Sequence, residues 1–262
     1  MKTSWFYLML ALVLAGCAQQ PPASRGQDSD RMEAASPRAR IHTELAAQYY
    51  MQRQYSVALQ EVREAIQSDA GYAPAYNILG LVHAALLEDK EAEANFRRSI
   101  ELAPQYSEAH NNYGYFLCSR LRRAEAMQHF EQAWKNPLYA MPERALANAG
   151  HCALKSGDLV EAEGYARRAL IRVDNQPQAL VTLAEIQYRR GNIAAARTVF
   201  QQLEAQGSLD PSALWLAVKL ERRGDNRVAE ANYGLQLRRN YPDSQEAGWL
   251  LNGQYDMPGG KQ

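Results

Sequence analysis

The feature that most constrains this sequence is a block that recurs about every 34 residues. A small residue stands at the same place in each block, usually four positions before a bulky one. These residues are Ala58, Ala92, Ala126, Ala162, Ala196 and Ala229, separated by 34, 34, 36, 34 and 33 positions. A period of this length is typical of repeated helical hairpins, in which two antiparallel helices pack on the next pair. Such repeats form one extended solenoid whose curved surface holds other molecules.

The blocks can be placed in register along residues 39–251. Gly80, Gly114 and Gly150 recur where the two helices of a hairpin should approach most closely. We expect six repeats, bounded approximately at 39–72, 73–106, 107–142, 143–176, 177–209 and 210–243. The pattern resembles the tetratricopeptide repeat. It predicts an all-α fold, a right-handed α-solenoid with a short C-terminal capping helix before residue 252, followed by a disordered tail over 252–262.

Composition and motifs argue against several classes of function. Lys and Arg total 29, as do Asp and Glu, and no basic block suggests nucleic-acid binding. We find no nucleophile elbow, phosphate loop or Cys-X-X-Cys pair. The five histidines show no pair at a spacing of three or four, so no metal site is expected. We therefore expect no enzyme activity, no cofactor and no small-molecule substrate.

Residues 1–16 have the pattern of a signal peptide. Lys2 supplies a positive end, and residues 5–14 form an apolar run too short to span a bilayer. The following Leu14-Ala15-Gly16-Cys17 resembles the lipobox of bacterial lipoproteins. That resemblance implies cleavage before Cys17 and attachment of lipid, including palmitate, to Cys17. An ordinary signal peptide with an incidental cysteine and an uncleaved membrane helix are the alternatives.

Residues 17–38 are expected to form a lipidated flexible tether. The polar stretch has no apolar periodicity and cannot bury enough surface to fold. About 20 flexible residues span about 25 Å, which would carry the repeats clear of the lipid headgroups. Ala18 follows the cysteine, where lipoproteins retained in the inner membrane usually have Asp. The sequence therefore predicts an outer-membrane anchor with the repeats on the periplasmic face.

Three blocks in the central repeats go beyond what the period requires. They are Asn111-Asn112-Tyr113-Gly114-Tyr115-Phe116-Leu117-Cys118, Asn136-Pro137-Leu138-Tyr139 and Asn148-Ala149-Gly150-His151-Cys152-Ala153-Leu154. Together they resemble the PilF/PilW family of type IV pilus assembly lipoproteins, over roughly residues 38–250. The resemblance implies a pilotin, which promotes outer-membrane localisation or multimerisation of the pilus secretin, or stabilises the pilus. Its partners would be the secretin or other pilus-assembly proteins.

A second interpretation from another functional class remains open. Lipidated helical repeats also serve as adaptors for peptidoglycan enzymes or for outer-membrane protein assembly. The double Asn with the cysteine after Phe116-Leu117, and the Asn136–Tyr139 block, are the features that favour the pilus interpretation.

Cys118 and Cys152 form a candidate disulfide. They are residue 12 of the third repeat and residue 10 of the fourth, on first helices that should pack side by side about 9–10 Å apart. An oxidising compartment would favour the bond, which should contribute about 3 kcal/mol. Two buried free thiols are the alternative.

The concave face, formed by the first helix of each repeat, is the expected binding groove. Asparagines can bond an extended peptide backbone, and tyrosines offer large, stiff contact surfaces. In contrast, Asn112 and Tyr113 are expected to hold their hairpin together. The groove positions are Tyr50, Asn77, Leu81, Asn111, Tyr115, Ala147, His151, Val181, Glu185 and Tyr188.

Overall fold

A computed structural model describes residues 35–207 and 209–255, and every regular element in these ranges is an α-helix. The predicted signal peptide, Cys17, the tether as far as residue 34 and residues 256–262 lie outside the described residues. In chain order the helices are α2 (Pro37–Met51), α3 (Tyr55–Ser68), α4 (Ala73–Ala85), α5 (Asp89–Leu102), α6 (Ser107–Ser119), α7 (Arg123–Lys135), α8 (Pro142–Lys155), α9 (Leu159–Arg172), α10 (Pro177–Arg189), α11 (Ile193–Glu204), α12 (Pro211–Arg223), α13 (Arg227–Asn240) and α14 (Gln245–Leu251).

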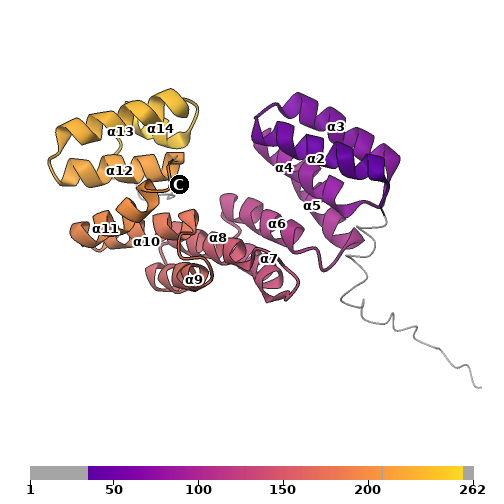
Figure 1. Cartoon of the computed structure of the whole chain (residues 1–262), viewed down its shortest axis with the longest axis horizontal. Coiled ribbons are helices and arrows are strands. Elements are labelled where there is room, and N and C mark those ends of the chain that lie inside the picture. Colours follow the sequence, from indigo (N-terminus) through magenta and orange to yellow (C-terminus); the bar gives the residue numbers. More distant parts are fainter. Residues whose placement is uncertain (1–34, 208, 256–262) are drawn as a thin grey trace, which may run out of the picture.

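The helices from α2 to α13 pair into six hairpins that stack into a curved solenoid (Figure 1). The first helices α2, α4, α6, α8, α10 and α12 each pack on the first helix of the next hairpin. Helix α14 packs on α12 and α13 and covers the last hairpin, as the end of a solenoid requires. The predicted all-α solenoid of tetratricopeptide repeats is confirmed.

The small residues of the period lie where the paired helices meet. A Cβ atom added to Gly80 would come within 2.8 Å of the ring of Phe96, and one added to Gly114 would meet Phe130 at the same distance. In the fourth repeat Gly150 instead faces the backbone of α9, where an added Cβ would lie 3.2 Å from a carbonyl oxygen. A larger residue would thus displace a phenylalanine ring at Gly80 and Gly114, and would be tightly packed at Gly150.

Each hairpin turn contains one residue with a left-handed backbone. These residues, with their φ angles, are Arg53 (59°), Leu87 (62°), Leu121 (62°), Gly157 (83°), Gly191 (80°) and Asp225 (55°). Only two of the six are glycine, the residue that adopts this conformation without a steric cost. The turn geometry is therefore imposed by the packing of the two helices rather than by glycine alone.

Two boundaries differ from the sequence expectation. Helix α2 begins at Pro37, inside the predicted tether, because proline is favoured in the first turn of a helix. The expected disorder from residue 252 is wrong for residues 252–255, because the Tyr255 ring packs on Trp215 of α12. Among the helices within the described ranges, none has the length and apolar character needed to cross a membrane.

Candidate functional site

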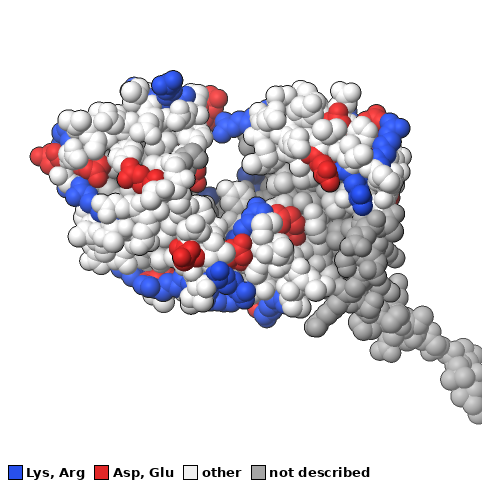
Figure 2. All heavy atoms as spheres, in the orientation of Figure 1, with Lys and Arg blue, Asp and Glu red and all other residues white. Residues whose placement is uncertain are grey.

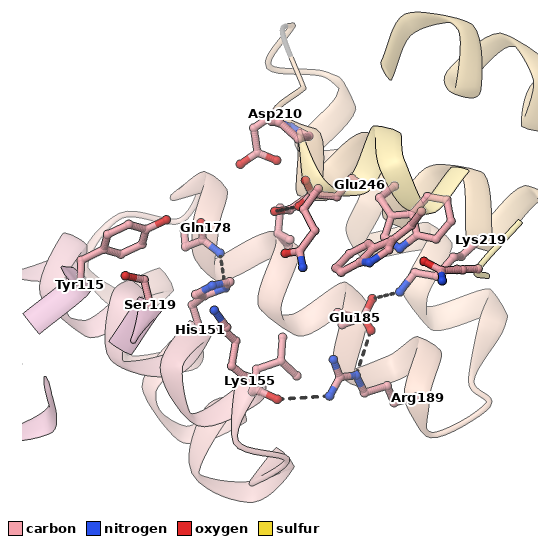
Figure 3. A pocket seen from close by; sticks show the side chains of 18 of the residues that line it. Tyr115, Ser119, His151, Lys155, Gln178, Glu185, Arg189, Asp210, Lys219 and Glu246 are labelled. Atoms are coloured by element: carbon pink, nitrogen blue, oxygen red, sulfur yellow. Dashed lines mark hydrogen bonds and ion pairs between the residues drawn. The ribbon is translucent and has the colours of Figure 1, made fainter. Parts of the chain in front are cut away.

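A cavity of about 760 Å³ opens on the concave side of the third to sixth repeats (Figure 3). Four of the predicted groove residues line it: Tyr115, His151, Val181 and Glu185. Its other lining residues come from the same first helices, from α14 and from the segments that flank them: Ser119, Leu121, Leu154, Lys155, Gln178, Arg189, Asp210, Pro211, Ser212, Trp215, Lys219, Gln245, Glu246, Trp249 and Gln254. The cavity is thus built by the stacking of repeats rather than by one of them.

One side chain from each first helix of these repeats forms a central line through the cavity. Tyr115, His151, Glu185 and Lys219 follow one another at intervals of 36, 34 and 34 residues, and all four line the cavity. The same helix face therefore carries an aromatic ring, an imidazole, a carboxylate and an ammonium group in succession. This line gives the groove a different chemistry at each repeat.

Glu185 forms ion pairs with two basic side chains at the floor of the cavity. Its carboxylate oxygens lie 2.8 Å from Arg189 Nε and 2.7 Å from Lys219 Nζ. Lys219 is buried, and its ammonium group also lies 4.8 Å from the centre of the Tyr188 ring. Charges removed from water need such pairing, so these four side chains form a fixed unit rather than a mobile one.

His151 and Lys155 supply the polar face of α8 in the cavity. The amide Nε2 of Gln178 lies 3.1 Å from His151 Nδ1, so this nitrogen accepts the hydrogen bond. Burial, and then the nearby Lys155 and Arg189, lower the pKa of His151 to about 4, which leaves it neutral at pH 7. Burial also lowers the pKa of Lys155, with a further contribution from Arg120. Among the described residues Lys155 has no hydrogen bond or ion pair.

Tyr115 lies at the centre of the concave face and is 49% exposed. Burial raises its pKa first, and the carboxylates of Asp210 and Glu246 raise it further. Tyr115 also raises the pKa of the Tyr50 hydroxyl in the first repeat, after the larger effects of burial and of Tyr55. The solenoid therefore curves until its first and last repeats both face α6, and Figure 2 shows the hollow between them.

Three predicted groove residues are buried, so their assignment to an open groove is wrong. Asn77 and Asn111 are each 1% exposed, and Ala147 is fully buried. Asn112 Nδ2 donates to Asn77 Oδ1 at 3.2 Å, and Asn148 Nδ2 donates to Asn111 Oδ1 at 2.9 Å. These amides bond neighbouring first helices to each other and are not available to a peptide.

The remaining predicted groove residues lie away from the cavity. Tyr50 is half-buried, and its ring centre lies 6.0 Å from that of Tyr55. Leu81 packs against the apolar cluster around Phe96. Tyr188 lies one turn beyond the main cavity and lines a smaller one of about 300 Å³.

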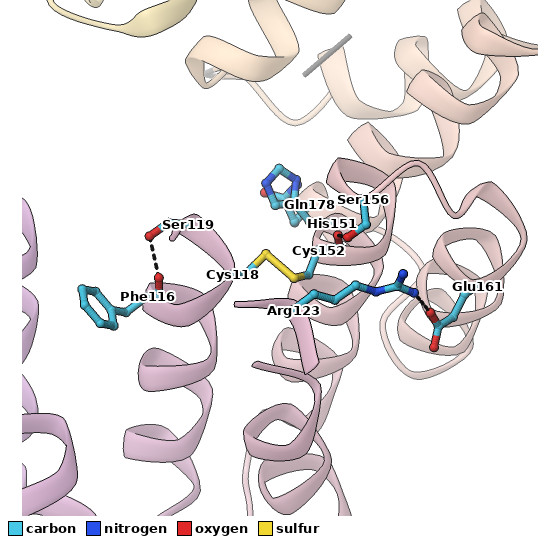
Figure 4. The surroundings of a disulfide bond; sticks show 9 residues. All are labelled: Phe116, Cys118, Ser119, Arg123, His151, Cys152, Ser156, Glu161 and Gln178. Carbon is cyan, nitrogen blue, oxygen red and sulfur yellow. Dashed lines mark hydrogen bonds and ion pairs between the residues drawn. A yellow bond between two sulfur atoms is a disulfide. The ribbon is translucent and has the colours of Figure 1, made fainter. Parts of the chain in front are cut away.

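The structure joins Cys118 and Cys152 in a disulfide (Figure 4). The two Cα atoms are 5.8 Å apart, and the bond connects α6 with α8. Both cysteines are buried, and their neighbours Ser119 and His151 line the cavity. The predicted pairing is therefore present, and it fixes the spacing of two helices that form the cavity wall.

A histidine pair, His110 buried in α6 and His129 half-buried in α7, was not foreseen, because 19 residues separate them. Their Nδ1 atoms are 3.0 Å apart, and His110 Nε2 lies 3.0 Å from the carbonyl oxygen of Pro104. Since this carbonyl only accepts, His110 donates from Nε2 and accepts from His129 at Nδ1. Within residues 35–207 and 209–255, no group of three or more His, Cys, Asp or Glu side chains could hold a metal ion.

Trp215 and Lys219 were also missed, although the period contains their signal. They follow Val181 and Glu185 by 34 residues each. The fifth repeat, residues 177–209, is one residue shorter than the period. Trp215 and Lys219 therefore stand one position later in the sixth repeat than Val181 and Glu185 do in the fifth. Alignment on the central line of the cavity recovers both residues.

Comparisons with known proteins agree with this architecture. The tetratricopeptide repeat family matches residues 153–220. The type IV pilus assembly protein PilF of Pseudomonas aeruginosa is 28% identical over 241 residues, which cover 91% of this chain and 93% of that protein. A solved structure of Pseudomonas aeruginosa PilF aligns with a TM-score of 0.63 and 26% identity, covering 87% of this chain and 99% of that one.

The crystal structure of PilW, described as a widely conserved type IV pilus biogenesis factor, is similar over its whole length. It aligns with a TM-score of 0.66 and 31% identity, covering 83% of this chain and 100% of the PilW chain. Sequence identity, coverage and fold together show that this protein belongs to the PilF/PilW family of tetratricopeptide-repeat proteins.

Proposed function

We propose that this protein is an outer-membrane lipoprotein that acts as a scaffold for type IV pilus biogenesis. It would work as a pilotin that promotes the outer-membrane localisation or multimerisation of the pilus secretin, or stabilises the pilus. The observation that carries this proposal is the concave cavity of repeats three to six, set in a chain whose relatives PilF and PilW are pilus proteins.

The shape and chemistry of the cavity suit an extended segment of a partner protein. A solenoid presents a long concave surface that is formed before the partner arrives. Tyr115 and Trp249 offer aromatic contact area, while Gln178, Lys155 and Glu246 offer donors and acceptors. Arg189 and Lys219 are both paired with Glu185, whereas Lys155 has no such pair among the described residues and can bind an acidic side chain of the partner.

The predicted lipid on Cys17 supports the membrane part of the proposal. Three acyl chains would hold the protein permanently, since each buried CH₂ contributes about 0.8 kcal/mol. The region between Cys17 and α2 would then set how far the groove lies from the membrane.

Deletion and complementation in the source bacterium test this function. We expect the deletion strain to lose twitching motility and the heat-stable multimers of the secretin, and the wild-type gene to restore both. Tyr115→Ala should restore them only partly. Ile171→Ala, which alters an 84% exposed residue on α9, serves as the matched control and should restore them fully.

The membrane anchor needs its own variant. Cys17→Ser should leave the protein folded but outside the outer-membrane fraction, with fewer secretin multimers. Normal secretin rings and normal pili in the deletion strain would refute the pilus function. Altered peptidoglycan cross-linking or outer-membrane protein levels in that strain would point instead to the adaptor function.

A further inference from the structure

The last described residues fold back onto the concave side of the solenoid. Gly253 has a φ of +65°, and its amide donates to the carbonyl oxygen of Leu250, while that of Gln254 donates to Trp249. This turn directs the chain towards α12, and Gln254 lines the main cavity. The residues after α14 are therefore part of the groove wall.

The Tyr255 ring occupies a site at this end of the groove that Trp215 and Arg222 of α12 form, here called the aromatic seat. The ring stacks on Trp215 with centres 5.6 Å apart and planes at 20°, and Arg222 lies 3.8 Å from the ring centre on α12. Stacking and cation–π contact are the two interactions that favour a flat aromatic side chain at such a position. Trp215 also lies against Trp249 of α14, with ring centres 6.0 Å apart, so Tyr255 is not its sole aromatic neighbour among the described residues.

The seat is continuous with the proposed binding groove. Lys219 lines both the main cavity and the smaller cavity of about 300 Å³, which Tyr188, Arg223 and Tyr255 also line. Lys219 and Arg223 lie over the Tyr188 ring at 4.8 and 5.1 Å from its centre. A partner segment that follows the groove towards the sixth repeat reaches this seat and finds it filled.

We propose that Trp215 and Arg222 form an aromatic subsite of the groove, which Tyr255 occupies in cis until an aromatic side chain of the partner replaces it. The identity of that partner rests on the proposed function, but the subsite does not. The positive charge of Lys219, Arg222 and Arg223 favours a partner segment without basic residues beside its aromatic one. In this chain, too, the residue that follows the aromatic Tyr255 is not basic but the acidic Asp256.

The replacement is feasible because little else holds the segment. Residues 252–255 follow the last helix and have no regular structure of their own, and the two backbone bonds of the turn involve α14 rather than α12. A tethered side chain competes through its high local concentration, so it reduces the affinity of a ligand without abolishing binding.

Binding of a synthetic peptide to the full chain tests the subsite. The probe is the peptide Asn-Gly-Gln-Tyr-Asp-Met-Pro-Gly-Gly-Lys, which copies residues 252–261. We expect it to bind the Tyr255→Ala protein at least 5-fold more tightly than wild type, because the seat is then vacant. Isothermal titration calorimetry gives the affinity, and tryptophan fluorescence reports contact with Trp215.

Matched peptides and variants distinguish binding at the subsite from non-specific binding. A peptide with Phe in place of its Tyr should retain binding, and one with Ala should lose it by at least 10-fold. Arg222→Gln added to Tyr255→Ala should weaken binding at least 5-fold. Leu251→Ala, which alters a 68% exposed residue at the end of α14 that lines neither cavity, should behave like wild type.

Two results would overturn the proposal. Equal affinity of wild type and Tyr255→Ala for the peptide would show that Tyr255 does not occupy the seat. Equal binding of the Tyr and Ala peptides would show that the seat does not select aromatic side chains. Thermal unfolding of each variant verifies that it is folded, and none of these measurements depends on pili or secretin.

Discussion

The side-chain amide of Asn148 in α8 donates a hydrogen bond of 2.9 Å to the side-chain oxygen of Asn111 in α6. Asn112 makes the equivalent bond to Asn77 one repeat earlier. The series stops at the fourth repeat, where Ala147 takes the place of the acceptor. Hydrogen bonds between side-chain amides thus join three consecutive first helices, α4, α6 and α8.

Replacement of Asn111 should therefore destabilise the solenoid. Asn111→Ala removes a buried amide and leaves the Asn148 donor without its acceptor, which should lower the free energy of unfolding by about 1–3 kcal/mol. Urea unfolding followed by circular dichroism measures the change. Asn95→Ala removes an exposed amide bonded to the Glu91 carbonyl and should change stability by less than about 0.5 kcal/mol. Equal effects of the two substitutions would contradict a structural role for the amide series.

The disulfide should stabilise the centre of the solenoid. It closes a loop of 34 residues, for which the restriction of the unfolded chain corresponds to about 3–4 kcal/mol. The double variant Cys118→Ala and Cys152→Ala should lose about this amount in urea unfolding. Addition of reductant to the unfolded wild-type protein should bring its refolded stability to a similar value. Mass spectrometry that found two free thiols in periplasmic protein would exclude the bond.

Stability should fall as the solution becomes acidic, because two half-buried histidines have lowered pKa values. Burial lowers the pKa of His129 to about 4, with a further effect from His110, and His151 behaves in the same way. The unfolded chain takes up protons near pH 6.5, whereas the folded protein resists them until about pH 4. The free energy of unfolding should therefore decrease between these values, by about 3 kcal/mol for each histidine.

Variants at the histidines test this pH dependence. His129→Gln should flatten the decrease between pH 6.5 and pH 4, since a neutral amide does not titrate. Gln128→Ala, which alters an exposed neutral side chain on the same helix, is the matched control and should leave the slope unchanged. Thermal unfolding over this pH range gives the slopes. An unchanged slope in His129→Gln would mean that its pKa is not lowered by burial.

Glu185 should be essential to the cavity floor. Glu185→Gln leaves Lys219 buried without its counter-charge, and removal of one partner from a buried pair costs about 3–5 kcal/mol. Replacing both partners by Gln and Met should recover much of that loss. Glu131→Gln, which breaks an exposed pair with Lys135, should change stability by less than about 1 kcal/mol. A single variant at Glu185 as stable as wild type would exclude a structural role for the pair.

The sequence predicts the repeats well because their requirement is local and recurs. Gly80 against Phe96 and Gly114 against Phe130 are the same close contact one period apart, and the intervals between small residues express it directly. The cysteine pair could also be placed from the register, since adjacent first helices must run side by side. These features depend on neighbouring repeats alone.

The groove is formed by residues of several repeats together, and only some of these residues could be predicted. Position counting put Asn77 and Asn111 on the open face, but the tight curvature places that part of the helix surface between neighbouring first helices, where the amides bond each other. Position counting also missed Trp215 and Lys219, because the fifth repeat is one residue short and shifts them by one position in the sixth repeat. Tyr255 gave no periodic signal at all, since it lies beyond the last repeat and contacts Trp215 and Arg222 of α12.

The left-handed residue in each hairpin turn has a consequence for how this surface can vary. Leu87 and Leu121 occupy positions where Gly157 and Gly191 do so without strain, and Leu87 is 78% exposed. The helices therefore dictate the turn, and the side chain at its tip contributes little to folding. Leu121 lines the cavity, but at the other five tips substitutions can alter surface contacts of the solenoid while leaving the groove intact.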